Sequence, residues 1–286
     1  MALVTDLFAD HSRIWQDNHY VYPVISRRSR GLSLGINLNP DTACNFDCVY
    51  CCVDRATPPR TKSVDLDRLR RELEAILKPT ANGDLFRAPP FDRTPEPLRR
   101  LNDIAFSGDG EPTTYPRFAE ACRLVTELRT WHGLDCKIVV ITNATVLARP
   151  GVEEGLAHLD AHGGEVWAKL DAGTQAWYAA VDRSDVPLDR VLANILACGR
   201  KRALCIQALF CRLHGEAPPA AELDAWADRL RDLRDGGCQI RQVQVYTTAR
   251  ATAESWVTAL NTAELEAIAQ RARDLGLEAE SYPGQS

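Results

Sequence analysis

Short strand patterns alternate with amphipathic helix patterns along this chain from residue 31 onward. The stretch 32–39, LSLGINLN, alternates strictly between apolar and small or polar residues, which is the period of a strand with one buried face. Further along, VDLDRLRRELEAILK places leucine and isoleucine on one side of a helix. This alternation predicts a parallel sheet built from βα units. The expected strands are 32–39, 103–107, 136–142, 165–171, 203–210 and 239–247, and the expected helices lie near 64–78, 116–130, 151–160, 187–200, 219–233 and 262–275.

The faces of these strands favour a barrel over a doubly wound sheet. Helices cover both faces of a doubly wound sheet, so its strands are apolar throughout. Here Trp167, Lys169 and Asp171 share one face of the fourth expected strand. Gln207 and Gln244 lie opposite the apolar faces of the fifth and sixth strands. We therefore expect an α/β fold, a partial (β/α)6 TIM-like barrel, with its functional site at the C-terminal ends of the strands.

The expected organisation is a core with two flanking segments. A chain of 286 residues is long enough for one large α/β domain or two small ones. We expect an N-terminal extension at 1–30 and the barrel core at 31–247, followed by a C-terminal helix and tail at 248–286 that packs on the core. Residues 80–100 are rich in proline and lack periodicity, which indicates a surface loop.

The composition is that of an ordinary globular protein, with 26% charged residues, 45% hydrophobic residues and a net charge of −5. The negative net charge argues against a nucleic-acid surface that covers the whole molecule. Asp6 and Asp10 interrupt the apolar run that a signal peptide would need, so we expect no signal peptide. No apolar run approaches the length of a membrane span. We therefore expect a cytoplasmic protein with no membrane partner. Because the cytoplasm is reducing, we expect the ten cysteines to be thiols or metal ligands rather than disulfides.

Four cysteines are crowded into DTACNFDCVYCCVDR, residues 41–55. Cys44, Cys48 and Cys51 form C-x3-C-x2-C directly after the first expected strand, and Cys52 is interpreted as a bystander. A zinc site usually takes four ligands from two knuckles, and the sequence has no second knuckle. A redox pair of thiols would leave one of the three cysteines unexplained. We favour a [4Fe–4S] cluster with one iron left open, and zinc or thiol redox chemistry stay as alternatives.

The segment CNFDCVYC, with an aromatic residue before its third cysteine, resembles the signature of the radical S-adenosylmethionine (SAM) superfamily. The resemblance implies a [4Fe–4S] cluster on Cys44, Cys48 and Cys51, with SAM chelating the fourth iron through its amino and carboxylate groups. It also implies an enzyme that cleaves SAM reductively to methionine and a 5′-deoxyadenosyl radical. The same resemblance implies a partial (β/α)6 barrel, and an electron donor such as flavodoxin or ferredoxin.

A second match closes the second expected strand. In FSGDGEPT, Gly110 and Glu111 resemble the end of the family's G-G-E-P element, which hydrogen-bonds to the SAM ammonium group. Asp109 departs from the pattern, because it stands where the first glycine of that element usually lies. Glycine permits close backbone approach to a ligand, whereas Asp109 adds a Cβ and a charge.

Further contacts with SAM are implied at the ends of the next strands. By the same resemblance, Asn143 in ITNAT is a candidate partner of SAM, and Asp171 in KLDAGT is a candidate for the ribose hydroxyls. Lys169 is expected either to meet the SAM carboxylate or to form an ion pair with Asp171. Tyr50 is expected near the adenine, with shielding of the cluster from water as the alternative.

The substrate is not legible from the sequence, and a small molecule and tRNA both stay open. The overall run of motifs most resembles the subgroup that includes wyosine-base synthases, which modify a guanosine in tRNA. Those enzymes carry a second cluster on three upstream cysteines, whereas residues 1–43 here contain none. A second class of function also stays open, an iron–sulfur or zinc binding module without SAM chemistry. Candidates for RNA contact are Arg27, Arg28, Arg30, Arg55, Arg60 and Lys62, and candidates for substrate contact are Gln207, Gln244, Tyr246, Arg250 and the hydrogen donor Cys211.

Overall fold

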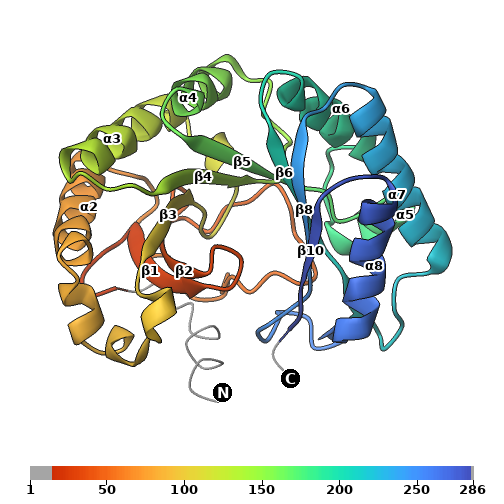
Figure 1. Cartoon of the computed structure of the whole chain (residues 1–286), viewed down its shortest axis with the longest axis horizontal. Helices are drawn as coiled ribbons and strands as arrows, with labels where there is room; N and C mark the ends of the chain where they lie inside the picture. The colour runs from red at the N-terminus through yellow and green to blue at the C-terminus, as the bar shows by residue number, and fades with distance from the viewer. Residues whose placement is uncertain (1–14, 285–286) are drawn as a thin grey trace. The chain divides into compact units, whose positions relative to one another are not determined.

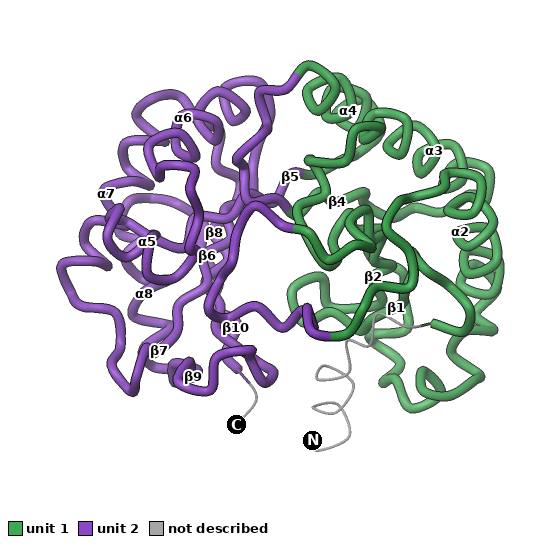
Figure 2. Tube along the Cα trace, turned by 180° about the vertical axis from the view of Figure 1, so that it is seen from behind, with its two compact units in different colours: residues 1–43, 57–141, 150–165 green, residues 44–56, 142–149, 166–286 purple. Residues whose placement is uncertain are grey.

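The computed structural model describes residues 15–284 (Figure 1). The first part of the expected N-terminal extension, residues 1–14, and the last two residues of the expected tail lie outside the described residues. The chain forms two compact units (Figure 2). Unit 1 comprises Met1–Ala43, Thr57–Ile141 and Pro150–Glu165, and unit 2 comprises Cys44–Ala56, Thr142–Arg149 and Val166–Ser286. The expected division at residues 30 and 247 stays a prediction.

Unit 1 contains a short mixed sheet with helices packed beside it (Figure 1). Strand β1 pairs antiparallel with β2, and β2, β3 and β4 follow one another in parallel. Every residue of β2 is buried, so the small or polar face of the expected first strand is covered as well as its apolar face. The strands are β1 (Val21–Ser26), β2 (Gly31–Ile36), β3 (Leu101–Phe106) and β4 (Lys137–Thr142), and the helices are α2 (Leu66–Ala81), α3 (Phe118–Trp131) and α4 (Pro150–Asp160).

Unit 2 contains parallel strands covered by helices, and a small second sheet. Strands β5, β6, β8 and β10 are parallel neighbours in that order, whereas β7 pairs antiparallel with β9. The strands are β5 (Gly164–Lys169), β6 (Leu204–Leu209), β7 (Cys211–Leu213), β8 (Ile240–Tyr246), β9 (Val257–Ala259) and β10 (Ala279–Tyr282). The helices are α5 (Gln175–Val181), α6 (Leu188–Gly199), α7 (Ala220–Asp235) and α8 (Thr262–Asp274).

All six expected strands and all six expected helices are confirmed, as β2, β3, β4, β5, β6 and β8, and as α2, α3, α4, α6, α7 and α8. The expected surface loop at 80–100 contains short helical turns that its sequence did not indicate. Three short 3-10 helices lie there: η1 (Asp84–Arg87), η2 (Phe91–Arg93) and η3 (Glu96–Leu98). In η1 and η2 the side chains of Leu85, Phe86 and Phe91 are buried, and a segment with buried apolar side chains must satisfy its backbone locally. None of the helices within residues 15–284 has the length and apolar character needed to span a bilayer.

The Glu72 carboxylate fixes the start of β1 in unit 1. It is buried and accepts hydrogen bonds from the backbone N–H groups of His19, Tyr20 and Val21, at 2.8, 2.8 and 3.2 Å. Arg68, one turn earlier on α2, donates to the same carboxylate at 2.8 Å. A buried carboxylate is stable only when its oxygens are paired in this way. Glu72 therefore stabilises the strand that adds to the edge of β2.

Asp103 in β3 gives unit 1 an expected pH dependence. Its carboxyl group is buried and accepts a hydrogen bond from Ser33, with Arg28 and Lys137 nearby, and burial raises its pKa above the ordinary value of 3.8. The folded protein therefore holds this proton more tightly than the unfolded chain does. As pH rises above about 4 the unfolded chain releases its proton first, so folding stability falls by about 1.4 kcal/mol for each unit of the raised pKa.

An Asp103→Asn variant removes this ionisation and keeps an acceptor for Ser33. We expect the free energy of unfolding of the wild type to fall relative to that of the variant between about pH 4 and 7, measured by urea denaturation. Asp92→Asn, which changes an exposed carboxylate of the same unit, is the control. Parallel pH curves for the wild type and Asp103→Asn would contradict the assignment.

Candidate functional site

The cysteine loop, residues 44–52, belongs to unit 2 and is anchored by apolar side chains. Phe46, Val49 and Tyr50 are buried. The ring of Phe46 packs edge-on against Tyr178, with centroids 5.6 Å apart. Cys44, Cys48 and Cys51 are half-buried between these anchors, and Cys52 is exposed. The alternation of anchors and cysteines therefore holds three thiols near the surface on a fixed backbone.

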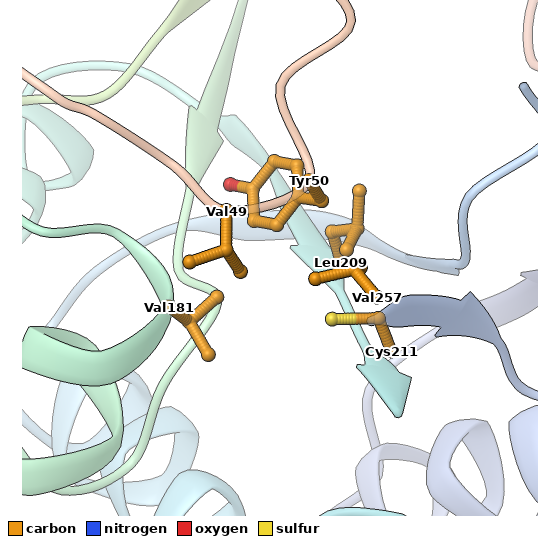
Figure 3. Packing of buried hydrophobic residues seen from close by; sticks show 6 residues of the cluster. All are labelled: Val49, Tyr50, Val181, Leu209, Cys211 and Val257. Atoms are coloured by element: carbon orange, nitrogen blue, oxygen red, sulfur yellow. The ribbon is translucent and has the colours of Figure 1, made fainter. Parts of the chain in front are cut away.

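One apolar cluster surrounds the loop and is shown in Figure 3. The hydroxyl of Tyr50 is directed away from Leu209 and Cys211 in that view. Cys211 is buried, and burial raises the pKa of its thiol to about 12, so it stays protonated at neutral pH. Its role as a hydrogen donor stays a prediction. The cluster consists of Val49, Tyr50, Val181, Leu209, Cys211 and Val257, with Cys48, Trp177, Leu213, Tyr246 and Trp256 packed against it.

The Tyr50 hydroxyl lies at the centre of a buried polar network. Lys169 Nζ donates to it at 2.6 Å, and it hydrogen-bonds to the carboxylates of Asp171 and Asp182. Lys169 and Asp171 form an ion pair at 3.2 Å, so one of the two expectations for Lys169 is present. The Cys48 thiol donates to Asp182 at 3.6 Å. The structure thus brings Tyr50, Lys169 and Asp171 together with a cysteine of the signature.

Burial and charge set the protonation of this network. Burial raises the pKa of Tyr50, and the neighbouring Asp171 carboxylate raises it further. Burial alone would lower the pKa of Lys169, but Asp171 together with Tyr246, Cys48 and Asp182 outweighs this effect, and the pKa is raised. Burial and Asp171 raise the pKa of Asp182 well above its ordinary value. Burial and the neighbouring Asp171 therefore disfavour a second charged carboxylate at Asp182, beside the ion pair of Lys169 with Asp171.

The segment that carries Asp171 is pinned against α7. The Glu222 carboxylate is buried and accepts from Gly173 N–H and from Thr174 Oγ1, both at 2.6 Å. Trp226 Nε1 donates to the carbonyl of Leu170 at 3.0 Å. A Cβ on Gly173 would lie 2.1 Å from the backbone nitrogen of Trp226, so only glycine fits. Asp171 itself accepts the Leu209 N–H at 2.8 Å.

Asn143, another predicted SAM partner, contacts the cysteine loop through a ring of side chains. Its Nδ2 donates to Asn45 Oδ1 at 2.7 Å, and Asn45 Nδ2 donates to Thr145 Oγ1 at 2.6 Å. Thr145 Oγ1 donates back to Asn143 Oδ1 at 2.7 Å. The turn between Asn143 and Thr145 is possible because Ala144 adopts a left-handed conformation, with φ +64°. Asn194 of α6 donates to both carbonyls of that turn, which fixes it.

The turn after β3 lies in unit 1 and explains the departure at Asp109. A Cβ on Gly110 would lie 2.1 Å from the carbonyl oxygen of Ala43, so glycine is required there. Asp109 instead has room for its side chain, which accepts from Asn37 Nδ2 at 2.5 Å. The buried Glu111 carboxylate accepts the Thr113 N–H at 3.1 Å. The expected contacts of Asp109, Gly110 and Glu111 with SAM stay predictions.

The glutamines named as substrate candidates form a directional chain of amides. Gln207 Nε2 donates to Gln244 Oε1 at 2.8 Å, and Gln244 Nε2 donates to Gln242 Oε1 at 3.4 Å. Gln242 Nε2 reaches the Glu280 carboxylate at 3.5 Å, which as an acceptor fixes the direction of the chain. The side-chain oxygen of Gln207, Oε1, is buried and has no hydrogen-bond donor among residues 15–284. Tyr246 is half-buried against the apolar cluster, and Arg250 follows β8.

The donor set of the cysteine loop fits an iron–sulfur cluster in kind and in chain position. All three signature cysteines are thiols on one loop, and Cys44 Sγ accepts the Phe46 N–H at 3.5 Å, the type of bond that stabilises sulfur ligands of iron. The Cys51 N–H bonds the Cys48 carbonyl at 2.9 Å and closes the turn between them. As described over residues 15–284, no three His, Cys, Asp or Glu side chains already form a ligand set. Ligation would deprotonate Cys48 and so end its donation to Asp182.

Sequence reasoning missed Asp182, Asn45 and Thr145. Asp182 follows α5, a helix of only seven residues that has no clear pattern in the sequence. Asn45 lies inside the cysteine motif and Thr145 is the last residue of ITNAT, and the resemblance assigns no role to either. The one available signal was the polar character of Asn45 and Thr145 next to motif residues.

Structural comparison identifies the fold. A radical SAM methyltransferase from Sphaerobacter thermophilus superposes with a TM-score of 0.64 at 14% identity, over 92% of this chain and 68% of that one. This chain has the fold of radical SAM enzymes. The TYW1 structure with a lysine-pyruvate adduct bound has a TM-score of 0.55 at 14% identity, over 96% of this chain and 82% of that one. The structure of anSMEcpe with bound AdoMet has a TM-score of 0.52 at 14% identity, over 87% and 61%. The expected α/β class and partial barrel of radical SAM enzymes are thereby confirmed.

Sequence comparison adds two curated relatives of this chain, and no family model matches it. A UPF0026 protein of Methanocaldococcus jannaschii is 30% identical over 182 residues, which are 61% of this chain and 48% of that protein. A protein named GTPase Obg from Brachyspira hyodysenteriae is 24% identical over 251 residues, 85% of this chain and 32% of that protein. The chain thus spans about half of the first relative and about a third of the second. No glycine here precedes a lysine, so this sequence lacks the phosphate-binding G-x-x-x-x-G-K-[ST] loop.

Proposed function

We propose that this chain is a radical SAM enzyme that binds a [4Fe–4S] cluster through Cys44, Cys48 and Cys51. The observation that carries the proposal is the C-x3-C-x2-C loop of three half-buried thiols in a chain with the radical SAM fold. When bound, the cluster and SAM would supply a 5′-deoxyadenosyl radical through reduction and cleavage of the sulfonium. The electron donor to the cluster would be a small electron-transfer protein such as flavodoxin or ferredoxin.

The residues of unit 2 would bind and orient SAM beside the loop. An ammonium group has three N–H donors. Lys169 uses donors toward Tyr50 and Asp171, so a further donor is left for the SAM carboxylate. Asp171 is fixed by the Leu209 N–H and by Tyr50, which suits a carboxylate that accepts from ribose hydroxyls. Asn143 would donate or accept beside Asn45, and the buried ring of Tyr50 would keep water from the cluster.

Anaerobic reconstitution with iron and sulfide tests this function. We expect a brown protein with about four iron and four sulfide ions per chain and broad absorbance near roughly 400 nm. After reduction with dithionite in the presence of SAM, chromatography should detect methionine and 5′-deoxyadenosine. A loaded cluster without any 5′-deoxyadenosine would instead support a binding module without SAM chemistry. Tight zinc binding that excludes iron would overturn both.

A tRNA-modifying function of the wyosine type is the second candidate, favoured by the fold likeness to the TYW1 structure. Its substrate would be RNA, and a small molecule is the alternative. If RNA binds through Arg27, Arg28, Arg30, Arg55, Arg60 and Lys62, the affinity for tRNA should fall steeply as salt rises. Filter binding of unmodified tRNA at two salt concentrations measures this. Absence of binding at low salt would remove this candidate and leave the radical SAM proposal standing.

A further inference from the structure

The segment 181–184, at the end of α5, runs alongside the cysteine loop and is bonded to it repeatedly. The Val49 N–H donates to the Val181 carbonyl at 2.9 Å, and the Asp47 N–H donates to the Asp182 carbonyl at 3.1 Å. Ser184 Oγ donates to the carbonyl of Asn45 at 3.1 Å. The loop between Cys44 and Cys51 is therefore held by backbone bonds that are independent of its sulfur atoms.

A second segment, 253–257, holds the other end of the loop. The Ala253 N–H donates to the carbonyl of Cys51 at 3.2 Å. Trp256 packs against the apolar cluster, and His214 stacks on its ring with centroids 4.4 Å apart and planes 9° apart. The His214 N–H donates to the Trp256 carbonyl at 2.9 Å, which fixes this segment beside β7. The backbone of Cys51 is thus bonded to a segment that is itself held by the stacking of Trp256 and His214.

One guanidinium group joins the loop to both segments. Arg183 Nη1 lies 3.5 Å from Asp47 Oδ2 in the loop and 2.8 Å from Glu254 Oε1 in the second segment. The same guanidinium lies over the ring of Trp256, 5.8 Å from its centroid. Arg183 adopts a left-handed backbone conformation with φ +48°, which is uncommon for a residue with a side chain. The Arg183 side chain thereby contacts both the cysteine loop and the segment 253–257.

We propose that Arg183 is a positioning residue for the cysteine loop, which acts through Asp47, Glu254 and Trp256 rather than by touching the cluster. The inference rests on the proposed function, because only a metal-binding loop needs its thiols held at fixed spacing. An exposed ion pair by itself contributes little to global stability. Arg183 should therefore affect the order of the loop and the retention of its metal far more than the melting temperature.

Hydrogen exchange of the protein without its cluster tests the positioning role directly. Asn tolerates the left-handed conformation, so Arg183→Asn removes the guanidinium without new backbone strain. We expect the amides of residues 47–51 to exchange about tenfold faster in this variant. Without the guanidinium contacts, local opening of the loop costs less free energy. Arg183→Lys, which keeps a cation beside Asp47 and Glu254, should recover part of the protection. Arg231→Ala, which removes an Arg–Asp pair on α7, is the matched control and should leave these amides unchanged.

The loaded protein gives a second readout. Iron loss to a chelator should be about fivefold faster in Arg183→Asn than in the wild type, and the electron paramagnetic resonance signal of the reduced cluster should broaden. Ser184→Ala, which removes one loop bond without touching Arg183, should show the same direction of change. Unchanged exchange and iron loss in Arg183→Asn, or equal changes in Arg231→Ala, would overturn the inference. A wild type that never forms a [4Fe–4S] cluster would refute the proposed function instead, while the exchange measurement would still report on the loop.

Discussion

Replacement of Cys48 by alanine is expected to reduce cluster loading to less than about a tenth of the wild-type level, since two thiolates do not hold a cubane cluster firmly. Formation of 5′-deoxyadenosine from SAM should be lost with it. The measurement is iron and sulfide per chain after anaerobic reconstitution, together with visible absorbance. Among the three signature cysteines, Cys48 is the most informative because its thiol donates to Asp182 in the network with Tyr50 and Lys169.

Cys52→Ala is the matched control for this experiment. Cys52 is exposed and adjacent to Cys51, so a loss of one thiol there should leave loading at the wild-type level. The Cys48 variant should fold, because Tyr50 still donates to Asp182 and the apolar anchors of the loop are intact. Its melting temperature establishes that point separately. Full cluster loading in Cys48→Ala would contradict the assignment of Cys48 as a cluster ligand.

The central strands could be predicted from the sequence because each carries a clean pattern, whereas the edge strands could not. β1 contains Pro23 in the middle of VYPVIS, and proline normally argues against a strand. It is tolerated because β1 pairs with β2 alone among the described strands and so has one side without ladder bonds to make. β10 is only four residues long and reads AESY, which has no apolar alternation. Tertiary pairing, not local propensity, makes both of them strands.

The candidate site was predictable where chemistry coincides with a strand end. Lys169 is the last residue of β5, and Asp171 follows two residues later on the same face. Their ion pair follows from that placement. Asp182 has no such signal, since its position depends on the way a seven-residue helix packs against the loop. Asp109 shows the opposite error. The sequence motif suggested that a glycine was missing there, while the close backbone approach falls at Gly110.

Replacement of Lys169 by methionine is expected to lower the free energy of unfolding by about 3 kcal/mol, because removal of one partner from a buried ion pair leaves an uncompensated charge. Lys169 is 17% exposed in its side chain and its partner Asp171 is 1% exposed, so water does not replace the lost ammonium. Methionine matches the length of the lysine stem and avoids a large cavity. Urea denaturation of the protein without its cluster measures the loss.

The matched control is Lys137→Met, which removes a lysine from the pair with Glu165 in unit 1. The Lys137 side chain is 58% exposed, so this loss should stay within about 0.5 kcal/mol. In the loaded protein, Lys169→Met should also weaken SAM binding about tenfold, since a charge-assisted hydrogen bond to its carboxylate is removed. Equal destabilisation by the two variants would contradict the claim that the ion pair between Lys169 and Asp171 is shielded from water. Unchanged SAM affinity in a folded Lys169→Met protein would confine this lysine to holding Tyr50 and Asp171 in place beside the cysteine loop.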